Sequence, residues 1–214
     1  MSSTPPPRIY VLAGVNGAGK SSIGGAAFRQ QGADYYNPDE VARRLTAADP
    51  TLTEMDANSA AWQQGVKLLR RAIEERLDFA FETTLGANTI PRLLTQAAPE
   101  GIEVSVWYVG LSSPELHIER VQARVRRGGH DIAAEHIHRR YDRSRLNLIE
   151  LLLYLTALRV FDNSEDADPA AGKTPKPKLV VHLERGKILK PRNLKRTPDW
   201  AKPIVAAALK SRLS

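Results

Sequence analysis

Residues 9–22 read IYVLAGVNGAGKSS, and this stretch decides the fold. Its first five residues are apolar and partly β-branched, which is typical of a buried strand. A glycine-rich turn follows at residues 14–19, and the residues from Lys20 to Gln31 have helical composition. The segment matches G-x-x-x-x-G-K-[ST] at each fixed position, between the strand and the helix that this motif requires. It therefore predicts a phosphate-binding loop at the first strand–helix junction of an α/β sheet.

The mechanics of such a loop assign expected roles to its residues. Its backbone N–H groups turn inward around a polyphosphate, and glycines leave them uncovered. We expect Lys20 to reach the β- and γ-phosphates of ATP and Ser21 to offer its hydroxyl to Mg²⁺. The helix that begins there adds its positive dipole end. The expected nucleotide-contacting residues are Gly14, Asn16, Gly17, Ala18, Gly19, Lys20, Ser21 and Ser22.

Strand and helix patterns alternate along the rest of the chain, which favours a parallel sheet flanked by helices. The predicted strands are residues 33–36, 78–84, 103–111 and 158–161, with a late strand or hairpin over 179–189. Predicted helices open at Asn37-Pro38-Asp39 and begin after caps at Asn88 and Ser113. Further helices are predicted over residues 57–77, 133–154 and 200–213. Residues 166–178 are expected to form a flexible loop. The prediction is one domain over residues 8–214, of the P-loop NTPase type, after a disordered leader at residues 1–7.

Composition excludes several classes of protein. The chain has 214 residues, 42% hydrophobic and 26% charged, so it can bury a core. It has no cysteine, which excludes disulfides and thiolate chemistry. Neither an apolar run of membrane-spanning length nor a secretion signal is visible, so we expect a cytoplasmic protein without a membrane partner.

The net charge of +7 belongs to one end of the chain. Residues 173–214 hold 12 of the 31 basic residues and two of the 24 acidic ones, so the remainder is slightly acidic. The pattern favours a solvated basic C-terminal extension over a nucleic-acid partner.

Carboxylates stand at the ends of two predicted strands, where ligands bind in an open parallel sheet. Asp39 follows the second strand and can accept the proton of an acceptor hydroxyl or begin a helix. Glu82 ends the third strand beside Thr83 and Thr84, and these groups can read a polar acceptor such as a sugar or simply face solvent. The pattern favours a small-molecule kinase.

Arginines dominate the helical segment over about residues 115–155. Arg120, Arg124 and Arg127 have i, i+4, i+7 spacing, which predicts one helical face. Planar guanidinium groups on a mobile flap suit the charge of a transferring phosphate, and Gly128-Gly129 supplies a hinge. Surface ion pairs explain some of these arginines. His130 is left open as a lid contact.

Taken together, these segments resemble the zeta-toxin family of P-loop kinases, in its small chromosomal branch. The resembling segments, in family order, are GVNGAGKSS (14–22), NPDEVA (37–42), FETTL (81–85), RVQARVRRGGHDI (120–132), RRYDRS (139–144) and FDNS (161–164).

The resemblance implies transfer of the γ-phosphate of ATP to a hydroxyl of a nucleotide-activated amino sugar such as UDP-N-acetylglucosamine, with an antitoxin protein as a possible partner. It implies that Asp39 is the base, that Lys20 binds phosphate, and that Asn37, Glu82, Thr83 and Thr84 contact the sugar. Arg124 matches one transition-state arginine, and the second is Arg127, Arg139 or Arg140. Three alternatives stay open: a kinase with another acceptor, an RNA-end kinase, and a nucleotide-binding module without catalysis.

Overall fold

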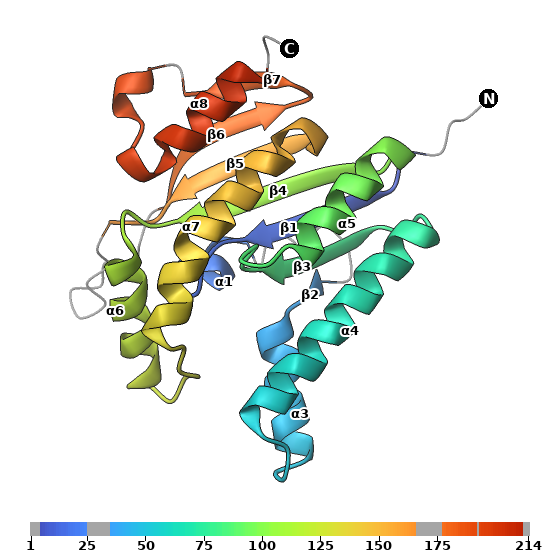
Figure 1. The fold of residues 1–214 in the computed structure, drawn as a ribbon, viewed down its shortest axis with the longest axis vertical. Helices are drawn as coiled ribbons and strands as arrows, with labels where there is room; N and C mark the ends of the chain where they lie inside the picture. The colour runs from blue at the N-terminus through green and yellow to red at the C-terminus, as the bar shows by residue number, and fades with distance from the viewer. Residues whose placement is uncertain (1–4, 25–34, 166–176, 192, 212–214) are drawn as a thin grey trace.

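The computed structural model describes residues 5–24, 35–165, 177–191 and 193–211. Within them, seven strands form one sheet in the order β2-β3-β1-β4-β5-β6-β7 (Figure 1). The strands are β1 (Arg8–Ala13), β2 (Tyr35–Tyr36), β3 (Phe79–Thr83), β4 (Glu103–Gly110), β5 (Ala157–Asp162), β6 (Lys178–Glu184) and β7 (Lys187–Lys190). The first five strands pair in parallel, which confirms the predicted α/β sheet. The late hairpin is confirmed as β6 and β7, and it extends the same sheet in antiparallel fashion.

Seven α-helices connect or cover these strands in the described ranges. They are α1 (Lys20–Ile23), α3 (Pro38–Ala48), α4 (Glu54–Glu74), α5 (Thr89–Ala97), α6 (Pro114–Val125), α7 (Ala134–Leu151) and α8 (Lys202–Lys210). The predicted helix after the phosphate loop is described only to Ile23, and most of its remainder lies outside the described residues. The leader residues 1–4, residues 33–34 of the second strand and most of the predicted loop, residues 166–176, also lie outside them.

The helix predicted to open at Asn37 and the predicted cap at Ser113 are confirmed. Asn37 Oδ1 accepts from the backbone N–H groups of Asp39 and Glu40, and the Ser113 hydroxyl accepts from the N–H of Leu116. The third prediction is wrong, because the Asn88 side chain makes no cap hydrogen bond with α5. Asn88 has helical backbone angles instead of the extended ones of a capping residue, and its Oδ1 accepts from the Arg143 guanidinium.

The main core lies between one face of the sheet and helices α4, α5, α7 and α8 (Figure 1). Val11 and Val106 of the central strands are fully buried there, as are Leu94 of α5 and Leu148 of α7. Alternate strand residues point to the opposite face, where Leu12 and Val109 pack with Ala18 and Ile23 at the phosphate loop and α1. The central strands are therefore buried on both faces, which explains their continuous apolar sequences.

The C-terminal segment packs onto the same core. Trp200 is 5% exposed, and its ring lies against Gly110, where an added Cβ would come within 2.3 Å of Trp200. Its indole N–H donates to Asp162 at the end of β5. Helix α8 follows and buries Ile204 and Ala208 in the core beside α7. None of the helices in the described ranges is long and apolar enough to cross a bilayer.

Candidate active site

The phosphate loop takes the conformation that its glycines allow. Gly17 and Gly19 have φ angles of 82° and 86°, in the left-handed region that L side chains rarely adopt. A Cβ on Gly17 would lie 2.5 Å from the carbonyl oxygen of His117, and one on Gly19 would lie 2.5 Å from Asn163 Nδ2. The backbone therefore follows a path closed to side chains, as a phosphate cradle requires, and α1 begins directly behind it.

Three distant side chains hold this loop. Asn163 follows β5, is 3% exposed and donates from Nδ2 to the Ala18 carbonyl at 2.8 Å. His117 of α6 donates from Nδ1 to the Asn16 carbonyl at 2.8 Å, and Arg140 of α7 donates to Asn16 Oδ1 at 2.7 Å. Sequence analysis left Asn163 without a role, because it lies 145 residues from its partner and only the fold brings them together. Burial lowers the pKa of His117 to about 4, so its ring is neutral near pH 7.

Lys20 is 8% exposed and lies between the phosphate loop and Glu82 at the end of β3. Its ammonium group donates to the carbonyl oxygen of Gly14 at 2.7 Å, and it lies 3.5 Å from Glu82 Oε1. The other carboxylate oxygen of Glu82 accepts from the Tyr35 hydroxyl at 2.8 Å and from Asn37 Nδ2 at 3.2 Å. The carboxylate thus joins the end of β3 to the start of α3, directly beside the phosphate loop.

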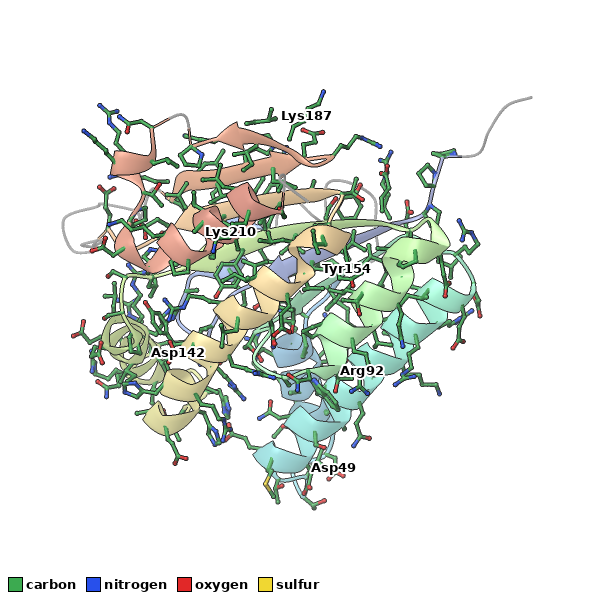
Figure 2. All side chains as sticks on the ribbon, turned by 45° about the horizontal axis from the view of Figure 1, so that its top comes forward. Asp49, Arg92, Asp142, Tyr154, Lys187 and Lys210 are labelled. Carbon is green, nitrogen blue, oxygen red and sulfur yellow. The ribbon has the colours of Figure 1, made fainter. Side chains whose placement is uncertain are left out.

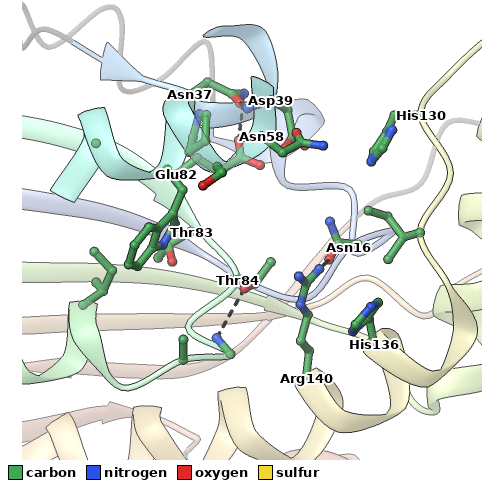
Figure 3. A pocket seen from close by; sticks show the side chains of 18 of the residues that line it. Asn16, Asn37, Asp39, Asn58, Glu82, Thr83, Thr84, His130, His136 and Arg140 are labelled. Carbon is green, nitrogen blue, oxygen red and sulfur yellow. Dashed lines mark hydrogen bonds between the residues drawn. The ribbon is translucent and has the colours of Figure 1, made fainter. Parts of the chain in front are cut away.

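A cavity of about 630 Å³ lies beside Lys20 and Glu82, which belong to its lining (Figure 3). Asp39 is exposed on its wall in the first turn of α3, and Thr83 and Thr84 line it at the end of β3. The two threonine hydroxyls accept from the backbone N–H groups of Leu85 and Gly86, which leaves their O–H groups able to donate. Asn16, Lys20 and Arg140 line the same cavity. The fold therefore brings the predicted phosphate and acceptor residues into one space.

One face of α4 forms the far wall of the cavity. Met55, Asn58, Ser59 and Trp62 follow helical spacing and line it together, with Met55 and Trp62 exposed. Sequence analysis did not single out these residues, since nothing local shows which helix faces the site. The lid loop between α6 and α7 closes the next side, where His130 Nδ1 lies 2.7 Å from Glu54 Oε1 at the start of α4. His130 is therefore a lid contact.

The predicted lid arginines differ in whether they reach the cavity. Arg140 is half-buried in the cavity wall, and burial, followed by the nearby Arg139, lowers its pKa, while the charge of Asp39 acts in the opposite direction. Arg124 lies outside the cavity lining and donates from Nη2 to the His130 carbonyl at 2.7 Å. Because α6 ends at Val125, Arg127 is exposed in the following turn, and the expected helical face of three arginines does not extend to it.

The residues present fit a nucleotide phosphate group, on the evidence of the glycine cradle and the adjacent lysine. Ser21 and Ser22 belong to α1 by their backbone, but their side chains lie outside the described part of the structure, so the expected Mg²⁺ contact of Ser21 stays a prediction. Among the described residues, no three histidine or acidic side chains gather into a metal-binding group.

Residues 9–147 match the AAA domain family AAA_33, which is about two thirds of the chain. The chain belongs to this family. An uncharacterized protein of Haemophilus influenzae is a relative, 32% identical over 129 residues that cover 60% of this chain and 88% of the relative.

Solved structures agree with the fold that the AAA_33 match indicates. The complex AvrRxo1-ORF1:-ORF2 with ATP is similar at a TM-score of 0.67 and 15% identity, covering 91% of this chain. The chain spans 64% of that protein's length. A protein of the PezAT chromosomal toxin-antitoxin system of Streptococcus pneumoniae is similar at a TM-score of 0.56 and 15% identity, covering 82% of this chain and 75% of that one. The fold is accordingly that of P-loop NTPases and kinases.

Proposed function

We propose that this protein is an ATP-dependent kinase that transfers the γ-phosphate to a hydroxyl of a small molecule held in the cavity of about 630 Å³. The observation that carries the proposal is the shared cavity: Lys20 and Asn16 of the phosphate loop line it together with Asp39 and Arg140. A phosphoryl donor and an acceptor can therefore meet without water between them. A binding module without catalysis would not need a carboxylate at that position.

The loop residues Gly14, Asn16, Gly17, Ala18, Gly19 and Lys20 would hold the nucleotide, with Ser21 and Ser22 continuing the binding surface at the start of α1. Backbone N–H groups and the Lys20 ammonium provide the positive field that a triphosphate requires. When bound, Mg²⁺ would neutralise phosphate charge, and Ser21 is its expected ligand.

Asp39 serves as the base in this proposal. The acceptor oxygen forms a bond to the γ-phosphorus, the bond from that phosphorus to the β–γ bridging oxygen breaks, and the acceptor proton passes to the Asp39 carboxylate. Arg140 lines the cavity and stabilises the charge that develops on the phosphoryl group. Arg124 and Arg127 can join it only if the lid loop rearranges, since Arg124 now bonds to His130.

We propose a nucleotide-activated amino sugar, of the UDP-N-acetylglucosamine kind, as the first acceptor to test. Asn37, Glu82, Thr83 and Thr84 offer donors and acceptors for sugar hydroxyls. The exposed Trp62 on the α4 wall offers a flat apolar surface for a ring. Because the PezAT protein belongs to a toxin-antitoxin system, an antitoxin-like protein is a proposed partner of this chain as well.

Incubation with γ-labelled ATP, Mg²⁺ and a panel of sugar nucleotides, sugars, nucleosides and single-stranded RNA tests the proposal. We expect label transfer to a sugar nucleotide and its loss in Asp39→Asn, which keeps size but removes the base. Glu40→Gln, on the next residue of α3, is the matched control. Label transfer to another member of the panel would support the proposed kinase activity and assign it a different acceptor. An Asp39→Asn protein as active as wild type would contradict the role of Asp39.

A further inference from the structure

The C-terminal strands carry a second cavity, also of about 630 Å³, away from the phosphate loop. It lies between β6, the end of β7 and residues 191 and 193–197, at the opposite end of the sheet from β2. Residues 178–197 lie beyond residues 9–147, which the AAA_33 family covers. The proposed kinase reaction uses none of its lining residues.

The charge of this cavity has one sign. Lys178, Lys190 and Arg196 line it, and none of the described lining residues is acidic. Lys178 and His182 of β6 both line the cavity, and Lys190 pairs with His182 across the ladder. The nearest carboxylates stand outside the lining: Glu165 pairs with Lys178, and Glu184 lies 3.6 Å from His182 Nε2. Leu179, Leu189 and Pro191 supply an apolar floor.

Two buried polar atoms at this cavity have no hydrogen-bond partner among the described residues. Thr197 is 7% exposed, and its hydroxyl oxygen is unpartnered. His182 Nε2 has no hydrogen-bond partner either, although its side chain is 20% exposed and Glu184 Oε2 lies 3.6 Å away. Buried polar groups in folded proteins are nearly always hydrogen-bonded, so the Thr197 hydroxyl, with His182 Nε2 beside the same basic cavity, indicates a ligand that accepts from both. A hydroxyl, an imidazole and three cationic groups are typical partners of a phosphate group.

We propose that this cavity, which we call the C-terminal basic site (Lys178, His182, Lys190, Arg196, Thr197), binds a phosphate group. The phosphate belongs either to a small phosphorylated molecule or to an RNA strand, which share this chemistry. Exposed lysines of the same region, such as Lys187 and Lys210 in Figure 2, lie outside the lining and add only a diffuse positive field. The inference does not depend on kinase activity.

Backbone amide NMR distinguishes this site from the phosphate loop. Inorganic phosphate is titrated into the full-length protein, and a 12-nucleotide single-stranded RNA forms the second arm. We expect saturable shifts at His182 and Thr197 that develop independently of those at Gly17 and Gly19. Shifts with phosphate indicate a small phosphorylated ligand, whereas shifts with RNA alone indicate a nucleic-acid strand; either outcome supports the site.

Three variants sharpen the test. The double variant Lys190→Glu/Arg196→Glu should weaken binding at His182 and Thr197 at least tenfold, while the shifts at Gly17 and Gly19 persist. Lys187→Glu/Lys210→Glu, with the same total charge change at two exposed lysines outside the cavity, should bind within twofold of wild type. Thr197→Val removes a hydroxyl that bonds to nothing described in the protein, so it should leave stability unchanged yet weaken binding about tenfold. Shifts confined to Gly17 and Gly19, or wild-type binding in Thr197→Val, would overturn the proposal.

Discussion

The phosphate loop, residues 14–19, is held by buried bonds along a backbone path closed to side chains, whereas the lid loop between α6 and α7, residues 126–133, makes few and partly exposed contacts. Positions 17 and 19 require glycine, because both have left-handed φ angles and a Cβ there would clash with the His117 carbonyl or the Asn163 side chain. The lid loop instead rests on two side-chain bonds, from His130 to Glu54 and from Arg124 to the His130 carbonyl. Exposed or half-buried side-chain bonds contribute little to stability, so they hold a segment less firmly than buried bonds do. The phosphate loop is therefore a preformed binding surface, and the lid loop is the part that we expect to move, since α6 and α7 on either side of it are packed through Val121, Ile137 and Leu148.

The largest expected effect comes from the loop. Lys20→Ala should abolish phosphoryl transfer, because no other ammonium group lies among the described residues that line the cavity. The fold should persist, since Glu82 keeps its bonds from Tyr35 and Asn37. Transfer from labelled ATP and circular dichroism measure the two effects, with the exposed Lys67→Ala on α4 as control. Wild-type transfer by the Lys20 variant would end the assignment of this residue.

Within the lid, Arg140→Ala should lower kcat on the order of 10³-fold, while ATP affinity changes much less. Arg140→Lys should restore little, because an ammonium group lacks the planar fork. Arg124→Ala should cost less than Arg140→Ala, since Arg124 contacts the lid loop outside the cavity. Steady-state kinetics compare the three, with exposed Arg139→Ala as the control on the same helix. A larger loss in Arg124→Ala than in Arg140→Ala would show that the lid closes with Arg124 toward the phosphate.

His117 joins the lid to the loop, and its titration should destabilise the protein in mild acid. Burial lowers its pKa to about 4 in the folded state, against an ordinary 6.5, so the unfolded chain binds more protons between these values. Stability should therefore fall as pH drops below about 6.5 and level off near 4, with a loss of about 2 kcal/mol between pH 7 and pH 5. Urea unfolding at both pH values measures it. His117→Gln should lose less over this interval, and an equal loss would assign the effect to other groups.

The smallest expected effect concerns the bond between His130 and Glu54. Both side chains are partly exposed, so their coupling should stay below about 1 kcal/mol. Opening it should raise the KM for the acceptor less than about fivefold and leave kcat nearly unchanged, because the lid only loses a contact. A double-mutant cycle of His130→Ala and Glu54→Ala measures the coupling, with exposed Glu74→Ala as control. A strong loss of kcat would instead place this pair in the chemistry.

The sequence by itself determined the phosphate loop, the parallel α/β order and most helix boundaries, because these follow from local rules. Glycine angles, apolar runs and the caps at Asn37 and Ser113 act within a few residues of their own position. The common position of Asp39 and Glu82 at one cavity is predictable for a similar reason, since the ends of parallel strands meet at one edge of the sheet.

Tertiary structure alone decided the partners of the arginines. Arg124 and Arg140 have similar local sequence signals, yet one bonds to a lid carbonyl and the other to the phosphate loop 124 residues away. Helical spacing states which residues share a face, but not what that face will meet. The same holds for Asn88, whose oxygen binds Arg143 instead of capping its helix, and for Asn163 on the phosphate loop. Such contacts join segments far apart in the chain, so no local pattern determines them.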